Sequence, residues 1–209
     1  MALRIPPGRA GRIWLVRRLD IARRGAELLD RKRQVLLREL ARVRTEAADA
    51  ELAWHEAAAQ VALWSARATM LDGPGRLELL ARHVQQRASL ELSWTNMMGA
   101  RLPSVERIDI PDPPPLSALG GSSATVLAAR ACADATRAAA RYVALQRAEA
   151  ELSAELRRAA RRLRALQNRW IPQHEAALAS LDLALDESQR EQSARARWVL
   201  RGLRLREGA

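Results

Sequence analysis

The residues that could do chemistry in this 209-residue chain are few and scattered. The pair His55-Glu56 resembles the start of a zinc-protease motif, but no second histidine follows four residues after the first. Cys132, the only cysteine, lies in an alanine-rich stretch, so no disulfide framework is expected. Gly73-Pro74-Gly75 lacks the Gly-Lys-Ser/Thr of a phosphate loop. We therefore predict a protein with no catalytic residue, no metal site and no cofactor.

Charge is unevenly distributed along the chain, whose formal net charge is +11. Residues 1–44 carry 13 basic and 4 acidic side chains, residues 45–140 carry 8 and 11, and residues 141–209 carry 14 and 9. The two ends are basic, which favours acidic partners there. No apolar run reaches the roughly 18 residues that a membrane span needs. Arginines also interrupt the N-terminal apolar segment, so we expect a cytoplasmic protein without a signal peptide.

Apolar residues recur at alternating intervals of four and three residues from Leu15 to Leu71. Sixteen of the seventeen positions in this series are apolar and only Arg33 interrupts it, although hydrophobic residues make up 48% of the chain. A sustained seven-residue repeat is typical of a coiled coil. The helix would be roughly 85–90 Å long, and no compact domain of this size could bury it.

A second series with the same spacing runs from Ala124 to Trp170. It then slips in phase and continues at His174 and Leu178 through consecutive steps of four residues, with Pro172 inside the slip. Such a stutter changes the local winding of a coiled coil, and a proline inside a helix bends the helix axis. We therefore predict a kink at Pro172, which the substitution Pro172→Ala should remove.

The segment between the two series has a different composition. Asp72-Gly73-Pro74-Gly75 ends the first helix. Apolar and polar residues alternate on both sides of Gly99, which predicts a β-hairpin. The prolines of residues 111–115 predict an extended linker, and Gly120-Gly121-Ser122-Ser123 predicts a turn whose serines can cap the next helix. This insert lets the chain turn back on itself.

The predicted fold class is therefore mainly α, with the N- and C-terminal helices paired in a long antiparallel coiled coil and a small central insert that contains a short β-hairpin. We expect one structural unit in three parts: a coiled-coil helix over residues 10–71, an insert over residues 72–122 and a second coiled-coil helix over residues 123–203. Antiparallel pairing would bring the two basic ends together into one positive pole.

Three blocks of the sequence follow the pattern of one protein family. The first extends from Pro7-Gly8-Arg9 to Arg38 and contains an Arg-Gly, two leucines, a lysine and a leucine; Lys32, the only lysine of the chain, falls where the pattern has one. The second is the segment 96–103, with Asn, Met, Gly, a basic residue and Pro. The third is the segment 161–166 followed by Ile171-Pro172.

These blocks resemble the D subunit of the V-type (vacuolar/archaeal-type) rotary ATPases, the central rotor shaft. In the third block Arg164 and Gln167 replace the Asn and Glu of the family, and residues 104–140 are the weakest match. The resemblance implies a non-catalytic subunit that forms the central stalk with the small F subunit. The coiled-coil tip would enter the hexamer of catalytic A and B subunits. The other end would couple, through a funnel-shaped subunit, to the membrane ring of proteolipids that carries protons or sodium ions.

The resemblance also assigns candidate roles to residues of this chain. Basic side chains would face the catalytic head, and the candidates are Arg17, Arg24, Arg31, Arg38, Arg161, Arg162 and Arg164. Apolar hairpin side chains would dock a smaller partner, and the candidates are Leu90, Leu92, Trp94, Met98 and Val105. Pro172 would make the shaft non-uniform. The subunit would transmit torque between ATP synthesis or hydrolysis and ion transport, and would lie in the cytoplasm at the periphery of the membrane.

Two other functions stay open from the sequence. The charge favours a basic helical protein that binds nucleic acid, but such a protein needs exposed groups that read or stack on bases, and Trp54, Trp64 and Trp170 fall on the apolar series. We therefore expect no nucleic-acid partner. A scaffold or membrane-surface coiled coil would bind anionic vesicles without any protein partner.

Overall fold

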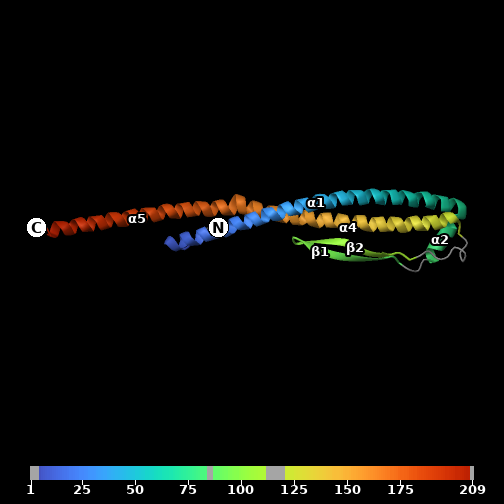
Figure 1. Ribbon diagram of the computed structural model, residues 1–209, viewed down its shortest axis with the longest axis horizontal. Coiled ribbons are helices and arrows are strands. Elements are labelled where there is room, and N and C mark those ends of the chain that lie inside the picture. Colours follow the sequence, from blue (N-terminus) through green and yellow to red (C-terminus); the bar gives the residue numbers. More distant parts are fainter. Residues whose placement is uncertain (1–4, 84–86, 112–120, 208–209) are drawn as a thin grey trace. The chain divides into compact units, whose positions relative to one another are not determined.

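The computed structural model describes residues 5–83, 87–111 and 121–207 and is almost entirely helical (Figure 1). In chain order its elements are α1 (Gly8–Asp72), α2 (Pro74–His83), β1 (Ser89–Met97), β2 (Ala100–Asp109), α4 (Ser123–Ala165), the π-helical turn η1 (Leu166–Trp170) and α5 (Ile171–Glu207). The predicted fold class is confirmed, because two long helical stretches pack together and a two-stranded antiparallel hairpin lies between them in the sequence. Apart from Pro111, the predicted linker lies outside the described residues.

The chain divides into two compact units. The terminal unit contains Met1–Arg33 and Arg158–Ala209, and the middle unit contains Gln34–Arg157. Helices α1 and α4 each contribute to both units.

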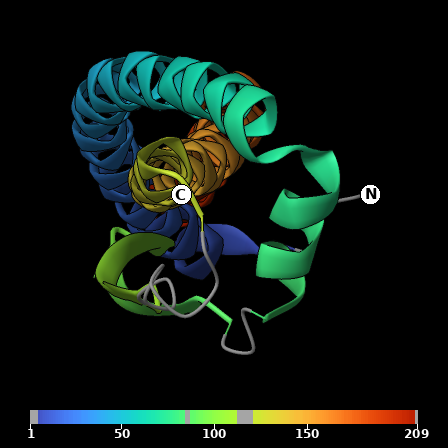
Figure 2. The same ribbon diagram turned by 90° about the vertical axis from the view of Figure 1, so that its right-hand side faces the viewer.

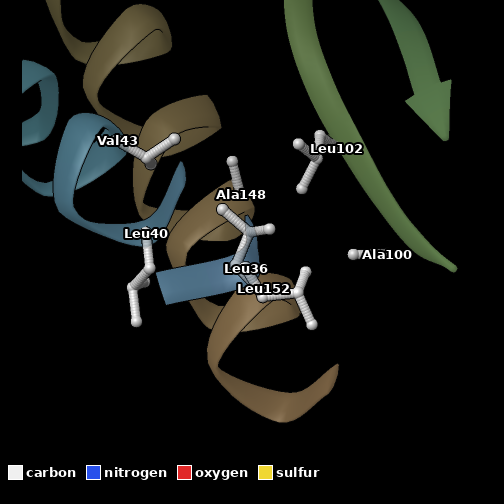
Figure 3. Close-up of a cluster of buried hydrophobic side chains, with 7 residues drawn as sticks. All are labelled: Leu36, Leu40, Val43, Ala100, Leu102, Ala148 and Leu152. Atoms are coloured by element: carbon white, nitrogen blue, oxygen red, sulfur yellow. The ribbon is translucent and has the colours of Figure 1, made fainter. Parts of the chain in front are cut away.

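Three elements meet in the core of the middle unit (Figure 3). Its buried side chains are Leu36, Leu40 and Val43 of α1, Ala148 and Leu152 of α4, and Ala100 and Leu102 of β2. Leu36 and Leu152 have no exposed surface, so each contributes roughly 1.5–3 kcal/mol of apolar burial. The view along the helices shows the hairpin lying against the α1–α4 pair (Figure 2). The hairpin is thus a third layer on the coiled coil.

The core of the terminal unit is a narrower seam that contains Leu15, Leu19, Ala22 and Ala26 of α1, Ala159 and Leu163 of α4, and His174 of α5. Two ion pairs bridge α1 and α5, from Arg12 to Asp182 at 2.8 Å and from Arg23 to Glu175 at 2.6 Å. Since the partner numbers fall along α5 as they rise along α1, the helices are antiparallel.

The middle unit shows the same antiparallel order. Arg44 of α1 pairs with Glu149 of α4 at 2.8 Å, and Trp54 stacks on Tyr142 with ring centroids 5.7 Å apart. The predicted seam of α1 is buried or half-buried at every position except Leu71, which is 68% exposed at the end of the helix.

The buried stripe of α4 differs in part from the predicted one. Ala144, Ala148 and Glu155 are buried, whereas the predicted seam residues Leu145 and Leu156 are only partly buried. Leu145 and Leu156 pack against the cluster that contains the β2 side chains. Helix α4 is therefore covered from two directions, by α1 and by the hairpin, which widens its buried face beyond a simple seven-residue repeat.

The hairpin turns at two residues with positive φ, Met98 at 50° and Gly99 at 86°. Two-residue hairpin turns of this kind match the right-handed twist of the strands, and the Asn96 side chain accepts a hydrogen bond from the Gly99 N–H at 3.2 Å. The strands pair from Met97 with Ala100 outward, and a bulge interrupts the register between Glu91 and Leu92. The predicted hairpin is confirmed.

Asp72 ties the end of α1 to the start of α4. Its carboxylate accepts hydrogen bonds from the Ser122 N–H at 3.0 Å, the Ser122 hydroxyl at 2.7 Å and the Thr125 hydroxyl. These bonds, above all those from Ser122, hold the pKa of Asp72 below its usual value. The start of α4 is thus anchored by an acid 50 residues away in the chain. Gly73 follows with φ of 78° and donates its N–H to Thr69 O at 3.0 Å, which ends α1.

Replacing Asp72 with Ala should lower the melting temperature by about 2–4 °C, because the first turn of α4 loses its anchor. A depressed carboxyl pKa stabilises the fold above the unfolded pKa, and this stability is lost as pH falls through the folded value. The wild-type protein should therefore lose more stability on acidification than Asp72→Asn. Thermal melts between pH 7 and pH 3 measure this. Asp134→Ala, which removes only an exposed pair with Arg137, is the control. An equal shift of the melting temperature in Asp72→Ala and Asp134→Ala would contradict the prediction.

Candidate functional site

The predicted basic residues are exposed in the structure. Arg17, Arg24, Arg31 and Arg38 lie on the exposed side of α1, and Arg161, Arg162 and Arg164 lie exposed on α4. All of them belong to the terminal unit except Arg38, which belongs to the middle unit. The predicted basic pole thus corresponds to an exposed set of guanidinium groups on two helices.

Ion pairs neutralise some of this positive charge. Arg24 pairs with Asp20 one turn earlier, and the hydrogen bond from this pair raises the pKa of Arg24. The cross-helix pairs engage Arg12 and Arg23. Within the described part of the chain, Arg17 and Arg31 take part in no ion pair, so their charges face solvent. Arg38, Arg161 and Arg162 are likewise exposed and take part in no ion pair there, so several of the predicted basic residues are available to an acidic partner.

The hairpin presents an apolar outer face. Leu90, Leu92 and Trp94 alternate along β1 and pair across the strands with Ile108, Val105 and Pro103. Paired residues of antiparallel strands lie on the same face of a sheet. The opposite face carries Met97, Ala100 and Leu102, which join the core. The opposite face therefore packs against the helices near the turn of the hairpin. On the outer face, the β1 side chains are exposed.

Several side chains of this outer face are accessible. Leu90, Leu92, Trp94 and Met98 are exposed, and Val105 is half-buried. The guanidinium of Arg101 lies over the Trp94 ring, 5.3 Å from its centroid, which holds the indole in place. The five predicted docking residues therefore gather on the outer face and the adjoining turn of one hairpin.

The predicted phase slip is present as the π-helical turn η1 (Leu166–Trp170). The Ile171 N–H donates to Leu166 O, five residues back instead of four. A π turn inserts one extra residue into a helix, and this residue keeps His174 buried and Leu178 half-buried after the slip. Pro172 lies two residues after the end of η1. Its missing N–H and its ring conflict with regular α-helical bonding there. Whether the axis also bends here stays a prediction.

His174 occupies a buried seam position directly after this turn and is 2% exposed. Its ring stacks on Trp170 with centroids 3.6 Å apart, and its Nδ1–H donates to the Trp170 carbonyl at 2.8 Å. Nε2 is buried without a hydrogen-bond partner among the described residues. The sequence placed His174 on the seam but could not show its stacking on Trp170, four residues earlier in the helix.

Among the described residues, no cluster of three or more His, Cys, Asp or Glu side chains could hold a metal ion. An open groove of about 710 Å³ lies between α1 and α4 of the middle unit, lined by Ala53, Glu56, Ala57, Gln60, Trp64, Leu127, Arg130, Ala131 and Asp134. Small alanines form much of its wall. None of the helices in the described part of the chain has the length and apolar content to cross a bilayer.

These features define a coiled-coil protein built for contacts with other proteins, with long paired helices and a hairpin insert. The sequence pattern of the ATP synthase D subunit family matches residues 13–201. The chain therefore belongs to this family, and as such it is part of a multi-subunit ATP synthase complex.

Relatives from bacteria and archaea agree with this assignment. The V-type ATP synthase D subunit of Thermus thermophilus is 26% identical over 189 residues, which cover 90% of this chain and 84% of the relative. The A-type ATP synthase D subunit of Pyrococcus furiosus is 28% identical over 210 residues, which cover 98% and 97%. The A-type D subunit of Pyrococcus horikoshii is 27% identical over 195 residues, which cover 90% of each chain. The similarity thus extends over both helices and the insert.

Pro172→Ala alone should leave the π turn in place, because the phase of His174 and Leu178 still requires the extra residue. Deleting exposed Arg169 in the Pro172→Ala background should instead give a regular α-helix with the seam in phase, and the melting temperature should stay close to that of the wild type. Arg157 is exposed on the regular helix α4. Deleting it rotates the following seam by about 100° and should lower the melting temperature strongly. Thermal melts and crystal structures would show this. An unbroken α-helix in Pro172→Ala with His174 still buried would contradict the prediction.

Proposed function

We propose that this chain is the non-catalytic central-stalk rotor subunit of a V/A-type ATP synthase. It would transmit torque between the catalytic head of A and B subunits and the membrane ring of proteolipids, and so couple ATP synthesis or hydrolysis to the transport of protons or sodium ions. The observation that carries the proposal is the pairing of α1, an uninterrupted helix of 65 residues, with α4 and α5 along antiparallel seams in both units.

A shaft must resist twisting and axial sliding, and the contacts between the paired helices are suited to both. The seam buries apolar side chains of the paired helices in each unit, which resists their separation. The pairs Arg12–Asp182 and Arg44–Glu149 bridge the helices in the two units. The anchor from Asp72 to Ser122 joins the end of α1 to the start of the returning helix. Each of these contacts would have to break before one helix slipped past the other.

The exposed basic residues support contact with an acidic catalytic head. Charge–charge contacts in water are weak individually and tolerate displacement better than a packed apolar interface, which suits a shaft that turns against its housing. In this proposal the ends of the chain enter the head. The protein would then lie on the cytoplasmic side, peripheral to the membrane, and a funnel-shaped subunit would couple it to the proteolipid ring.

The hairpin would bind a permanent partner, the small F subunit of the central stalk. Its outer face offers apolar side chains at alternate positions around Trp94. An exposed aromatic ring among apolar neighbours is the kind of anchor that dominates interface energetics.

Assembly tests the proposed function directly. When the chain is co-expressed with the A, B and F subunits of its own organism, one copy should join each hexameric head and be visible by native mass spectrometry. Leu152→Asp, which places a charge in the core, should abolish assembly. If the A, B and F subunits assemble while this chain stays alone, the proposal is contradicted. Affinity for duplex DNA that survives physiological salt with a steep log–log salt slope would favour the nucleic-acid alternative instead.

Trp94→Ala and Leu92→Asp should each weaken the binding of the F subunit by about tenfold or more, since they remove anchors from the apolar face. Titration calorimetry of the purified chain against the purified F subunit measures this. Met70→Asp changes another exposed apolar residue, 87% exposed on α1 of the same unit, and should leave the affinity unchanged. Equal losses in all three variants would show that the hairpin is not the docking surface.

A further inference from the structure

A line of apolar residues, the first half-buried and the other two exposed, runs along α1 in the terminal unit. Trp14, Ile21 and Leu28 follow one another at intervals of seven residues. Ile21 and Leu28 are 69% and 64% exposed, so no other described part of the chain covers them. They lie outside the seam that faces α5, whose α1 members are Leu15, Leu19, Ala22 and Ala26.

Basic residues flank this line on both sides. In a helix the neighbours of a residue lie three and four positions away. Around Ile21 these positions hold Arg17, Arg18, Arg24 and Gly25, and around Leu28 they hold Arg24, Gly25, Arg31 and Lys32. No acid lies at these positions, but Arg24 pairs with Asp20 one turn earlier, whereas Arg17 and Arg31 take part in no ion pair among the described residues. We call this surface, from Trp14 to Lys32, the basic trough.

Gly25 lies at the centre of the basic trough, and the fold of the chain does not require a glycine at this position. A glycine inside a helix costs roughly 0.5–1 kcal/mol relative to alanine, yet a Cβ atom at Gly25 would meet nothing within 4 Å. Its backbone conformation is helical and does not demand glycine. A glycine that the fold does not need, between two exposed apolar residues, allows another backbone to approach α1 closely.

We propose that the basic trough binds an acidic amphipathic α-helix of a partner protein, with the apolar stripe of that helix against Trp14, Ile21 and Leu28 and its carboxylates against the flanking arginines. A line one residue wide with a seven-residue repeat fits one helix. The unpaired charges of Arg17 and Arg31 would exclude a second copy of the same trough by repulsion. A nucleic acid would need no apolar line, and a membrane surface would have no use for Gly25.

The inference rests on the proposed function only for the identity of the partner, since the helix would belong to a subunit of the catalytic head. The chemistry of the surface can be tested without the head. The probe is a fluorescein-labelled helical peptide, about three heptads long, with Leu at heptad positions a and d and Glu at e and g. Its binding to the full chain is followed by fluorescence anisotropy.

Leu28→Asp should weaken peptide binding by about tenfold or more, which corresponds to ~1.4 kcal/mol. Leu52→Asp is the matched control, because Leu52 is an equally exposed leucine of α1, at 63%, and it should leave binding unchanged. Gly25→Leu should also weaken binding while leaving the melting temperature the same or higher, a result that no folding defect can produce. Arg31→Glu should lower affinity for the Glu peptide and raise it for a peptide with Lys at e and g.

Equal behaviour of Leu28→Asp and Leu52→Asp would overturn the inference, as would tighter binding of phosphatidylserine vesicles or duplex DNA than of the Glu peptide. A photo-crosslinking residue at position 28 of the assembled complex should label an acidic segment of a head subunit, and labelling of basic segments alone would also overturn it. If the peptide results hold but the chain never joins a head, the proposed function fails and the trough stands. If assembly succeeds and Leu28→Asp binds the peptide normally, the trough fails and the proposed function stands.

Discussion

The narrow apolar seam between α1 and the returning helices is the interaction on which the rest of the structure depends. In the terminal unit it is made of leucines and alanines that leave only one side of each helix buried. Because alanines fill as many of these positions as leucines, the helices can approach closely, but each alanine contributes little apolar area. The free energy of pairing must therefore be gathered over many turns. A seam of this kind works only if its phase is held over its whole length.

Three local features serve that requirement. The anchor at Asp72 fixes where the returning helix begins, and the cross-helix ion pairs bridge the two helices. The π turn absorbs the residue by which the second series departs from a seven-residue repeat. Without it His174 would rotate out of the seam and lose its burial. The hairpin adds width at Leu36 and Leu152, where it covers a second side of α4.

The periodicity of the sequence was sufficient to predict the helices, the seam of α1 and the position of the phase slip, because all three depend on residue spacing alone. It failed at Leu71, which follows the spacing but lies at the end of α1, and over part of α4, where the hairpin widens the buried face: Ala144 and Ala148 are buried there, and the predicted Leu145 and Leu156 are only partly buried. The anchor from Asp72 joins residues 50 positions apart, and no local pattern marks it. The spacing alone does not mark Ile21 and Leu28 as a separate exposed line, because they lie beside the longer apolar series of the seam.

Because the seam is narrow, the exposed residues must provide the contacts with partners. A two-stranded coil leaves most of its surface to solvent, so its function must be carried by departures from a uniform polar face. The exposed apolar residues of β1 gather on one sheet face, and the exposed Ile21 and Leu28 form a line with the half-buried Trp14 on one side of α1. A shaft that turns inside a ring of like subunits can distinguish them only if its own sides differ. Under the proposed rotor function, the proposed basic trough on one side of α1 would provide that difference, because one member of the ring at a time would meet its apolar line while the other members met other sides of the coil.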